Sequence, residues 1–198
     1  MDFVKEFATF LYQNGAIKFG NFKLSSGKES PYYIDLRLVP SFPHQFRKMI
    51  KALQNSISEK IGFENFDCIA SVPTSGLVIA SALAIELVKP LIYIRQKPKE
   101  YGTENVIEGK IPKGTRVLLV DDVATTGHSL INAIKHLKNE GMIVTDAFTI
   151  INRFEGARET LAAENIRLYE ITDIMTLATI LHQEGLVDDQ TFDALKNK

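Results

Sequence analysis

The chain has 198 residues, of which 45% are hydrophobic and 24% are charged, and its formal net charge is −1; this balance suits one globular domain and excludes a general attraction to nucleic acid or membrane surfaces. Its single cysteine, Cys68, excludes an internal disulfide framework or a multi-cysteine metal site and is typical of a reducing, cytoplasmic compartment. The N-terminal segment lacks the apolar core of a secretory signal, and no stretch approaches the roughly 18 consecutive apolar residues that a membrane-spanning helix needs.

Residues 1–60 predict two amphipathic helices on either side of a segment of short strands. Residues 2–14 and 44–60 carry apolar side chains at three-to-four-residue spacing, which is typical of helices packed on a core. Residues 16–40 are punctuated by glycine and serine and are rich in aromatic residues, which favours short strands. We therefore expect residues 1–40 to form an N-terminal helix and a small hood.

From residue 41 onward, apolar strand-like runs alternate with helical stretches. Strands are expected at residues 66–72, 91–95, 116–120, 143–151 and 166–171. Helices are expected at residues 76–88, 129–141 and 155–165 and at the end of the chain. This alternation predicts an α/β fold whose central, mostly parallel sheet is flanked by helices. We expect a single domain over residues 1–198, with its α/β core over residues 41–198.

The polar, glycine-bearing stretch over residues 96–115 is long for a link between elements of a compact α/β domain. Arg95, Lys97 and Lys99 crowd its start. Such a charged run is usually a solvated face, but the length of the stretch and Gly102 favour a mobile loop that closes over a ligand and delivers positive charge.

The stretch "VLLVDDVATTGHSL" (residues 117–130) carries the most specific chemical signal in the chain. A strand, a Gly/Thr/Ser turn and a helix N-terminus together form an anion site, because backbone N–H groups converge there and the helix dipole adds positive charge. The natural ligand is a phosphate monoester. Asp121 and Asp122 would repel that phosphate, so they suit sugar hydroxyls or a divalent cation. Phosphate on one side and hydroxyls on the other describe a ribose 5-phosphate, although an acidic pair that merely caps a turn is the alternative.

Two other nucleotide motifs are excluded. The "GKIPKGT" stretch has Thr115 where a Walker loop requires lysine, and the sequence contains no G-x-G-x-x-G fingerprint.

The stretch "VLLVDDVATTGHS" resembles the phosphoribosyl pyrophosphate signature of type I phosphoribosyltransferases. Three further stretches are similar to orotate phosphoribosyltransferases: the N-terminal segment over residues 15–37, the basic loop over residues 93–103, and "INRFEGARETL" over residues 151–161. The resemblance covers most of the chain in the right order. It implies the type I phosphoribosyltransferase fold, a homodimer with shared active sites, and a loop that closes over the neighbouring subunit's site.

The resemblance also implies roles for individual residues. Arg95, Lys99, Asp121 and Asp122 are the expected catalytic residues. The residues expected to bind phosphoribosyl pyrophosphate are Thr74, Ser75, Gly76, Arg95, Lys99, Tyr101, Asp121, Asp122, Val123, Ala124, Thr125, Thr126, Gly127, His128 and Ser129. The residues expected to bind orotate are Lys28, Tyr32, Tyr33, Thr125 and Arg153. A Mg²⁺ cofactor is expected to be held mainly by the substrate, with Asp121 and Asp122 as candidate ligands.

The residue chemistry fits these roles, with alternatives left open. Arg153 offers a planar fork for the carboxylate of orotate, a flat anion. Tyr32 and Tyr33 offer ring faces or hydroxyls, or form a hood core. Lys28 reaches an anion or is simply solvated.

The chain departs from the common family pattern at four positions. Gln96 replaces the second basic residue of the loop, and Tyr101 replaces its histidine, which puts a general-acid role there in doubt. Ser75 and Ser25 stand where many members carry lysine. Binding of the diphosphate is therefore expected to depend more on backbone amides, magnesium and Lys28.

The expected function is Mg-dependent transfer of ribose 5-phosphate from phosphoribosyl pyrophosphate to orotate, giving orotidine 5'-monophosphate and pyrophosphate in de novo pyrimidine (UMP) biosynthesis. A phosphoribosyltransferase for another base is one alternative. A non-catalytic sugar-phosphate sensor is the other, but it predicts a nucleic-acid-binding module or a basic patch, and the sequence shows neither.

Overall fold

The computed structural model describes residues 3–23, 29–95 and 106–196. Contacts divide the chain into two compact units. The first comprises Met1–Met49 together with Thr172–Lys198, and the second comprises Ile50–Ile171. The expectation of a single domain over the whole chain stays a prediction.

The first unit is built from helices and one antiparallel hairpin. It contains α1 (Phe3–Gln13), β1 (Ile17–Lys23), β2 (Glu29–Ile34), the 3₁₀ helix η1 (Leu36–Ser41), the start of α2 (Pro43–Lys60), α6 (Ile174–Gln183) and α7 (Asp189–Lys196). The hairpin pairs Ile17 with Ile34, and its register shifts between Phe19 and Phe22. Phe7 and Leu11 of α1 are fully buried, as the amphipathic pattern predicts.

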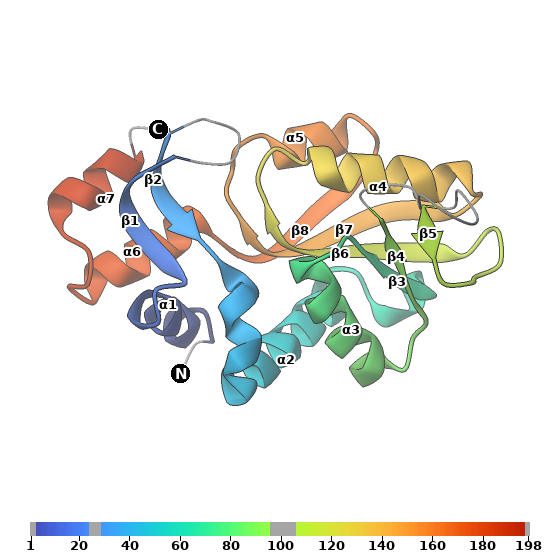
Figure 1. Ribbon diagram of the computed structural model, residues 1–198, viewed down its shortest axis with the longest axis horizontal. Coiled ribbons are helices and arrows are strands. Elements are labelled where there is room, and N and C mark those ends of the chain that lie inside the picture. Colours follow the sequence, from blue (N-terminus) through green and yellow to red (C-terminus); the bar gives the residue numbers. More distant parts are fainter. Residues whose placement is uncertain (1–2, 24–28, 96–105, 197–198) are drawn as a thin grey trace. The chain divides into compact units, whose positions relative to one another are not determined.

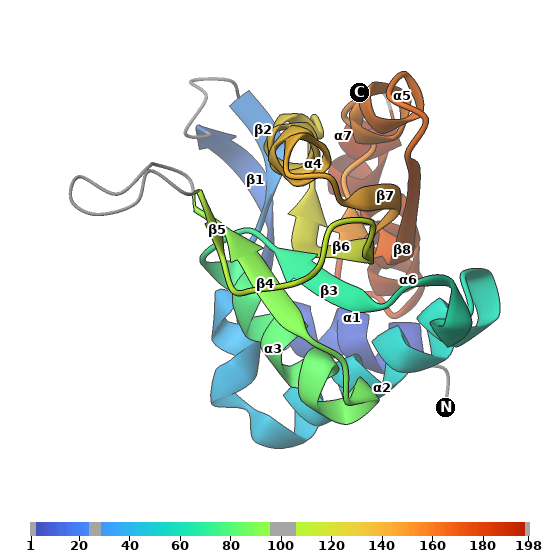
Figure 2. The same cartoon turned by 90° about the vertical axis from the view of Figure 1, so that its right-hand side faces the viewer.

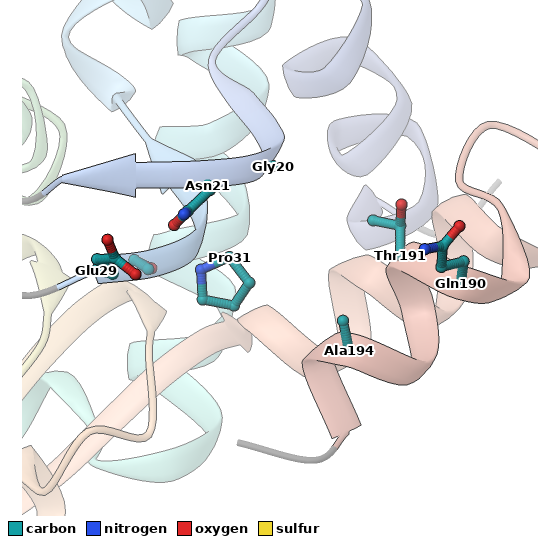
Figure 3. Close-up of a pocket in the computed structure, with 8 residues that line it drawn as sticks. Gly20, Asn21, Glu29, Pro31, Gln190, Thr191 and Ala194 are labelled. Carbon is teal, nitrogen blue, oxygen red and sulfur yellow. The ribbon is translucent and has the colours of Figure 1, made fainter.

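A cavity of about 660 Å³ lies in the first unit, between the hairpin and α7 (Figure 3). Asn21 and Glu29 contribute from the hairpin, and Gln190 and Thr191 from α7. Of the residues that the structure describes, none that lines this cavity belongs to the predicted site.

The second unit contains a six-stranded sheet, shown in Figure 1. Its strands are β3 (Cys68–Ser71), β4 (Leu91–Ile94), β5 (Ile107–Glu108), β6 (Arg116–Ala124), β7 (Ile143–Asn152) and β8 (Arg167–Asp173), whose last residues fall in the first unit. The strand order is β5-β4-β3-β6-β7-β8. β3 is parallel to both β4 and β6, β6 is parallel to β7, and β5 is antiparallel to β4.

Helices of the second unit lie on both faces of the sheet. α3 (Ser75–Leu87) connects β3 to β4, and α4 (His128–Asn139) connects β6 to β7. Figure 2 shows these two helices on opposite faces of the sheet. Residues 50–60 of α2 and the short helices η2 (Phe63–Asn65) and α5 (Ala157–Ala162) also belong to this unit. The α/β fold with a mostly parallel central sheet is therefore confirmed.

Burial follows the apolar pattern of the strands. Cys68, Ile69 and Ala70 of β3 are fully buried, as are Leu119 and Val120 of β6. Burial raises the pKa of the Cys68 thiol to about 11. Cys68 is therefore a buried thiol of the sheet core.

The stretch expected to form one long loop over residues 96–115 contains a strand in its second half. Ile107 and Glu108 form β5 and pair with β4, while residues 96–105 lie outside the described residues. The closing motion of this loop stays a prediction.

Among the helices that the structure describes, none has both the length and the apolar character needed to cross a membrane.

Candidate active site

The two adjacent aspartates lie within β6 rather than beyond it. The sequence places the end of the strand at Val120, because the apolar run stops there. In the structure β7 extends the ladder, pairing with Asp121 through Thr149 and with Ala124 through Asn152. The expectation that the aspartates follow the strand is therefore wrong. Backbone pairing with β7 keeps these polar residues in the strand. The hydrophobic pattern of the sequence does not predict this pairing.

Asp121 is a buried carboxylate that contacts its neighbour's backbone. Only 9% of the residue is exposed, and its Oδ1 atom accepts a hydrogen bond from the Asp122 N–H at 2.9 Å. Burial, and then the adjacent Asp122 charge, raise the pKa of Asp121 well above its ordinary value. The Asp122 side chain is half-buried, and the Asp122 carbonyl accepts a hydrogen bond from the Thr149 Oγ1 at 2.9 Å. The two carboxylates thus have different environments at one strand end.

The start of α3 lies against Asp121. β3 and β6 pair in parallel with Ser71 opposite Val120, and the Ser71 hydroxyl donates to the Val120 carbonyl at 2.7 Å. α3 follows directly, and a β-carbon at Gly76 would lie 2.3 Å from the Asp121 Oδ1. Two of the predicted ligand segments, distant in sequence, therefore meet at one edge of the sheet.

The segment before this contact is accessible. The peptide bond between Pro73 and Thr74 is cis. Thr74 is exposed and Ser75 is half-buried at the first position of α3. Both residues can therefore present polar groups to a ligand at this edge of the sheet.

The turn from β6 into α4 spans residues 125–127, and α4 begins at His128. Gly127 has φ +81°, and a β-carbon there would lie 2.8 Å from the Leu161 side chain and 3.1 Å from the Ala157 Cα. Glycine is thus required both by its conformation and by the close packing of α5.

The side chains of this turn vary in exposure. Ala124 is buried, Thr125 and Thr126 are half-buried, and Ser129 is exposed. The His128 Nδ1 lies 2.9 Å from the Thr126 Oγ1, so the two side chains form a polar pair at the helix N-terminus. The N–H groups of the first turn of α4 and these hydroxyls supply the donors that a phosphate needs.

Arg153 follows the end of β7, and its backbone is hydrogen-bonded to the last residue of β6. Its N–H donates to the Ala124 carbonyl at 2.9 Å. Its side chain is 9% exposed, and its Nε and Nη2 atoms donate to the Glu155 Oε1 at 3.2 and 2.9 Å. The guanidinium predicted to bind orotate therefore already contacts a carboxylate of this chain.

Arg95 shows the same arrangement after β4. Its Nη1 atom lies 3.1 Å from the Glu108 Oε1 on β5, and its N–H donates to the Val106 carbonyl at 2.8 Å. Lys28, Lys99 and Tyr101 lie outside the described residues. Their predicted roles stay predictions.

The two tyrosines of the hood belong to the first unit. Tyr32 is 3% exposed, which favours the hood-core interpretation. The half-buried Tyr33 donates its hydroxyl to the Asp35 Oδ2 at 3.4 Å, and that hydroxyl accepts from the Arg37 Nη2 at 3.2 Å. A direct contact of either tyrosine with orotate stays a prediction.

The donor set for a divalent cation is small. Within residues 3–23, 29–95 and 106–196, no three His, Cys, Asp or Glu side chains gather as a metal-binding group. The Asp121 Oδ1 already accepts a backbone hydrogen bond, so the more accessible Asp122 is the better ligand. These residues fit a Mg²⁺ ion that takes most of its ligands from a bound substrate.

Comparison with known proteins gives a family for this arrangement. Residues 43–172 match the phosphoribosyl transferase domain family. The chain is 52% identical over 187 residues to the orotate phosphoribosyltransferase of Cenarchaeum symbiosum, an alignment that covers 94% of both chains. The chain belongs to the orotate phosphoribosyltransferase family.

Solved structures agree with this membership. The orotate phosphoribosyltransferase of Aeropyrum pernix is 36% identical, with a TM-score of 0.79, over 91% of this chain and 99% of that chain. The UMP synthase of Leishmania donovani is 30% identical, with a TM-score of 0.85, over 98% of this chain. This chain spans 41% of the length of that synthase.

Four residues that contact the candidate site were not predicted from the sequence. They are Ser71, Glu108, Thr149 and Glu155. Ser71 and Thr149 are polar residues inside strands, and only the strand pairing reveals that they contact β6. Glu155 carries a weak signal, because an acidic residue two positions after Arg153 is compatible with a local ion pair.

Proposed function

We propose that the chain catalyses the transfer of ribose 5-phosphate from phosphoribosyl pyrophosphate to orotate, which gives orotidine 5'-monophosphate and pyrophosphate for UMP synthesis. One observation carries the proposal: the acid pair of β6 leads directly into the Thr125–Gly127 turn, and Gly76 of α3 lies against Asp121. The names of the relatives supply the substrates.

The ribose would be held from two sides. Asp121 and Asp122 accept hydrogen bonds, so they suit the sugar hydroxyls. The turn over residues 125–127 and the first N–H groups of α4 donate hydrogen bonds, so they suit the 5-phosphate. Donors and acceptors are thus separated along one short stretch, which fixes the orientation of the sugar.

The diphosphate would lie towards Thr74, Ser75 and Gly76. The N-terminus of α3 offers N–H groups there, and Arg95 offers a charged fork. When bound, Mg²⁺ neutralises negative charge on the diphosphate. Among the described residues, the half-buried Asp122 would contribute to its coordination, and substrate oxygens would supply most of the other ligands.

The reaction needs no nucleophile from the protein. The bond between the anomeric carbon and the diphosphate oxygen breaks, and the diphosphate leaves with the electron pair. A ring nitrogen of orotate then bonds to the anomeric carbon, and its proton passes to the departing diphosphate or to water. Positive charge develops on the sugar during this exchange, and the Asp121 and Asp122 carboxylates stabilise it electrostatically.

Arg153 would orient the acceptor. Its backbone is tied to Ala124, the residue that precedes the phosphate turn, so its side chain is anchored at a fixed place relative to the sugar site. A planar guanidinium matches the carboxylate of orotate.

Assembly and location belong to the same proposal. We propose a homodimer in which the basic loop of one subunit serves the other subunit's site, and a cytoplasmic location consistent with the single free cysteine. Size-exclusion chromatography with light scattering would test the dimer.

A steady-state assay tests the activity directly. Orotate, phosphoribosyl pyrophosphate and Mg²⁺ are mixed with the enzyme, and the loss of orotate absorbance is followed. Hypoxanthine, xanthine and adenine serve as alternative acceptors. Among these acceptors, we expect turnover only with orotate. Turnover with a purine but not with orotate would overturn the proposal.

A further inference from the structure

The ion pair between Arg153 and Glu155 is more ordered than a surface contact. The two side chains are 9% and 21% exposed. The Nε and Nη2 atoms of Arg153, which form one edge of the guanidinium, both donate to the Glu155 Oε1. Two donors that converge on one oxygen fix the plane of the guanidinium as well as its distance.

The backbone on both sides of Arg153 is also fixed. The Arg153 N–H donates to the Ala124 carbonyl at 2.9 Å. The fully buried Asn152 accepts a hydrogen bond from the Phe154 N–H through its Oδ1 at 2.9 Å. With the main chain held at residues 153 and 154, the Glu155 contact fixes the Nε/Nη2 edge of the guanidinium.

Two physical arguments favour a positioning role over simple charge balance. A guanidinium carries five N–H groups, so it can serve more than one carboxylate. Glu155 lies only two residues from Arg153, so little chain entropy is lost in forming the pair. A side chain oriented before the ligand arrives binds more tightly, because the ordering cost has already been met.

We propose that Glu155 is a positioning residue for the acceptor. It holds Arg153 by the Nε/Nη2 edge and thereby orients the fork that meets the carboxylate of orotate. This inference rests on the proposed function. It assigns to Glu155 an effect on the affinity for orotate and none on the binding of phosphoribosyl pyrophosphate.

The test compares the full-length wild-type chain with Glu155→Ala and Glu155→Gln. A matched control is Glu159→Gln, which removes one negative charge from an exposed position of α5. The KM for each substrate and kcat are measured for all four proteins. A urea titration of each variant establishes that it is folded, and Glu155→Gln keeps the shape of the side chain if the alanine variant does not fold.

We expect Glu155→Ala to raise the KM for orotate by about tenfold or more, as truncating one partner of a buried charge pair does. The KM for phosphoribosyl pyrophosphate should stay within about twofold, since the proposed role of Glu155 acts through Arg153 and hence on the acceptor. Glu155→Gln should lie between wild type and Glu155→Ala, because its amide oxygen still accepts from Arg153. Glu159→Gln should match wild type.

Three results would overturn the inference. A lower KM for orotate in Glu155→Ala would mean that Glu155 competes with the substrate. An unchanged KM would mean that the pair is only structural, and equal rises in both KM values would mean a general distortion. Wild-type enzyme that consumes no orotate would instead refute the proposed function, so the two failures are distinguishable.

Discussion

The carboxylate of Asp121 lies directly against Gly76, where a β-carbon would be 2.3 Å from the Asp121 Oδ1. The same β-carbon would lie 2.8 Å from the Ser71 Oγ and 3.0 Å from the Asp121 Cα. These distances are too short for any side chain. α3 can therefore approach β6 only because residue 76 is glycine, and this approach joins the diphosphate segment to the acid pair.

Gly76→Ala should disable the enzyme by displacing either Asp121 or the start of α3. We expect kcat/KM for phosphoribosyl pyrophosphate to fall by about 100-fold or more, because misplacement of about 1 Å near the reacting groups has that effect. Steady-state kinetics measure it. Gly114→Ala is the control, since a β-carbon there meets nothing within 4 Å although φ is +81°. It should lose some stability and keep its kinetic constants.

Asp121→Asn should separate activity from stability. We expect the rate to fall by about 10²–10³-fold, because the variant loses a charge that stabilises the transition state. At pH 8 the urea midpoint should rise, since burial penalises the Asp121 carboxylate and raises its pKa.

The pH dependence gives the sign of this effect. The pKa of Asp121 is higher in the folded chain than in the unfolded chain, so folding is favoured below the unfolded pKa and weakened as pH rises through the folded pKa. The stability gained by Asp121→Asn should therefore shrink between pH 8 and pH 5. A gain that is equal at both values would contradict the buried-carboxylate assignment.

Arg95→Ala should weaken the binding of phosphoribosyl pyrophosphate. We expect kcat/KM for this substrate to fall by about 10²–10³-fold, since the diphosphate would lose a charged donor. Arg116→Ala is the matched control. Like Arg95, Arg116 forms an ion pair with a carboxylate, that of Asp67 at 2.7 Å, but Arg116 lies at the end of β6 opposite to the acid pair. An equal fall in kcat/KM in both variants would show that Arg95 does not contribute to the site.

The fold and the segments of the candidate site could be predicted from the sequence because both leave local sequence patterns. Apolar runs mark the strands, and the turn chemistry of Thr125–Gly127 marks the predicted anion site, which stays a prediction. The end of β6 was not accessible, because Asp121 and Asp122 interrupt the apolar run and only the pairing with β7 carries the strand to Ala124. Ion pairs such as Arg95–Glu108 and Arg153–Glu155 depend on side-chain placement, which periodicity does not encode.

Cys68 should be unreactive in the folded enzyme. It is fully buried, and its pKa of about 11 leaves almost no thiolate at neutral pH. A thiol reagent that reports by absorbance should label one group per chain in urea and essentially none in buffer at pH 7.5. Labelling of the native enzyme within minutes would contradict the packing of β3.

The residues proposed to bind the sugar and those proposed to bind the acceptor lie on different segments of the sheet. The groups that would hold the sugar lie on β6 and at its exit, whereas Arg153 and its glutamate follow β7. Under the proposed function, recognition of the sugar would belong to a central strand, whereas acceptor preference would depend on the short segment that follows β7. Engineering towards other bases should therefore begin at residues 153–155 and leave the acid pair untouched.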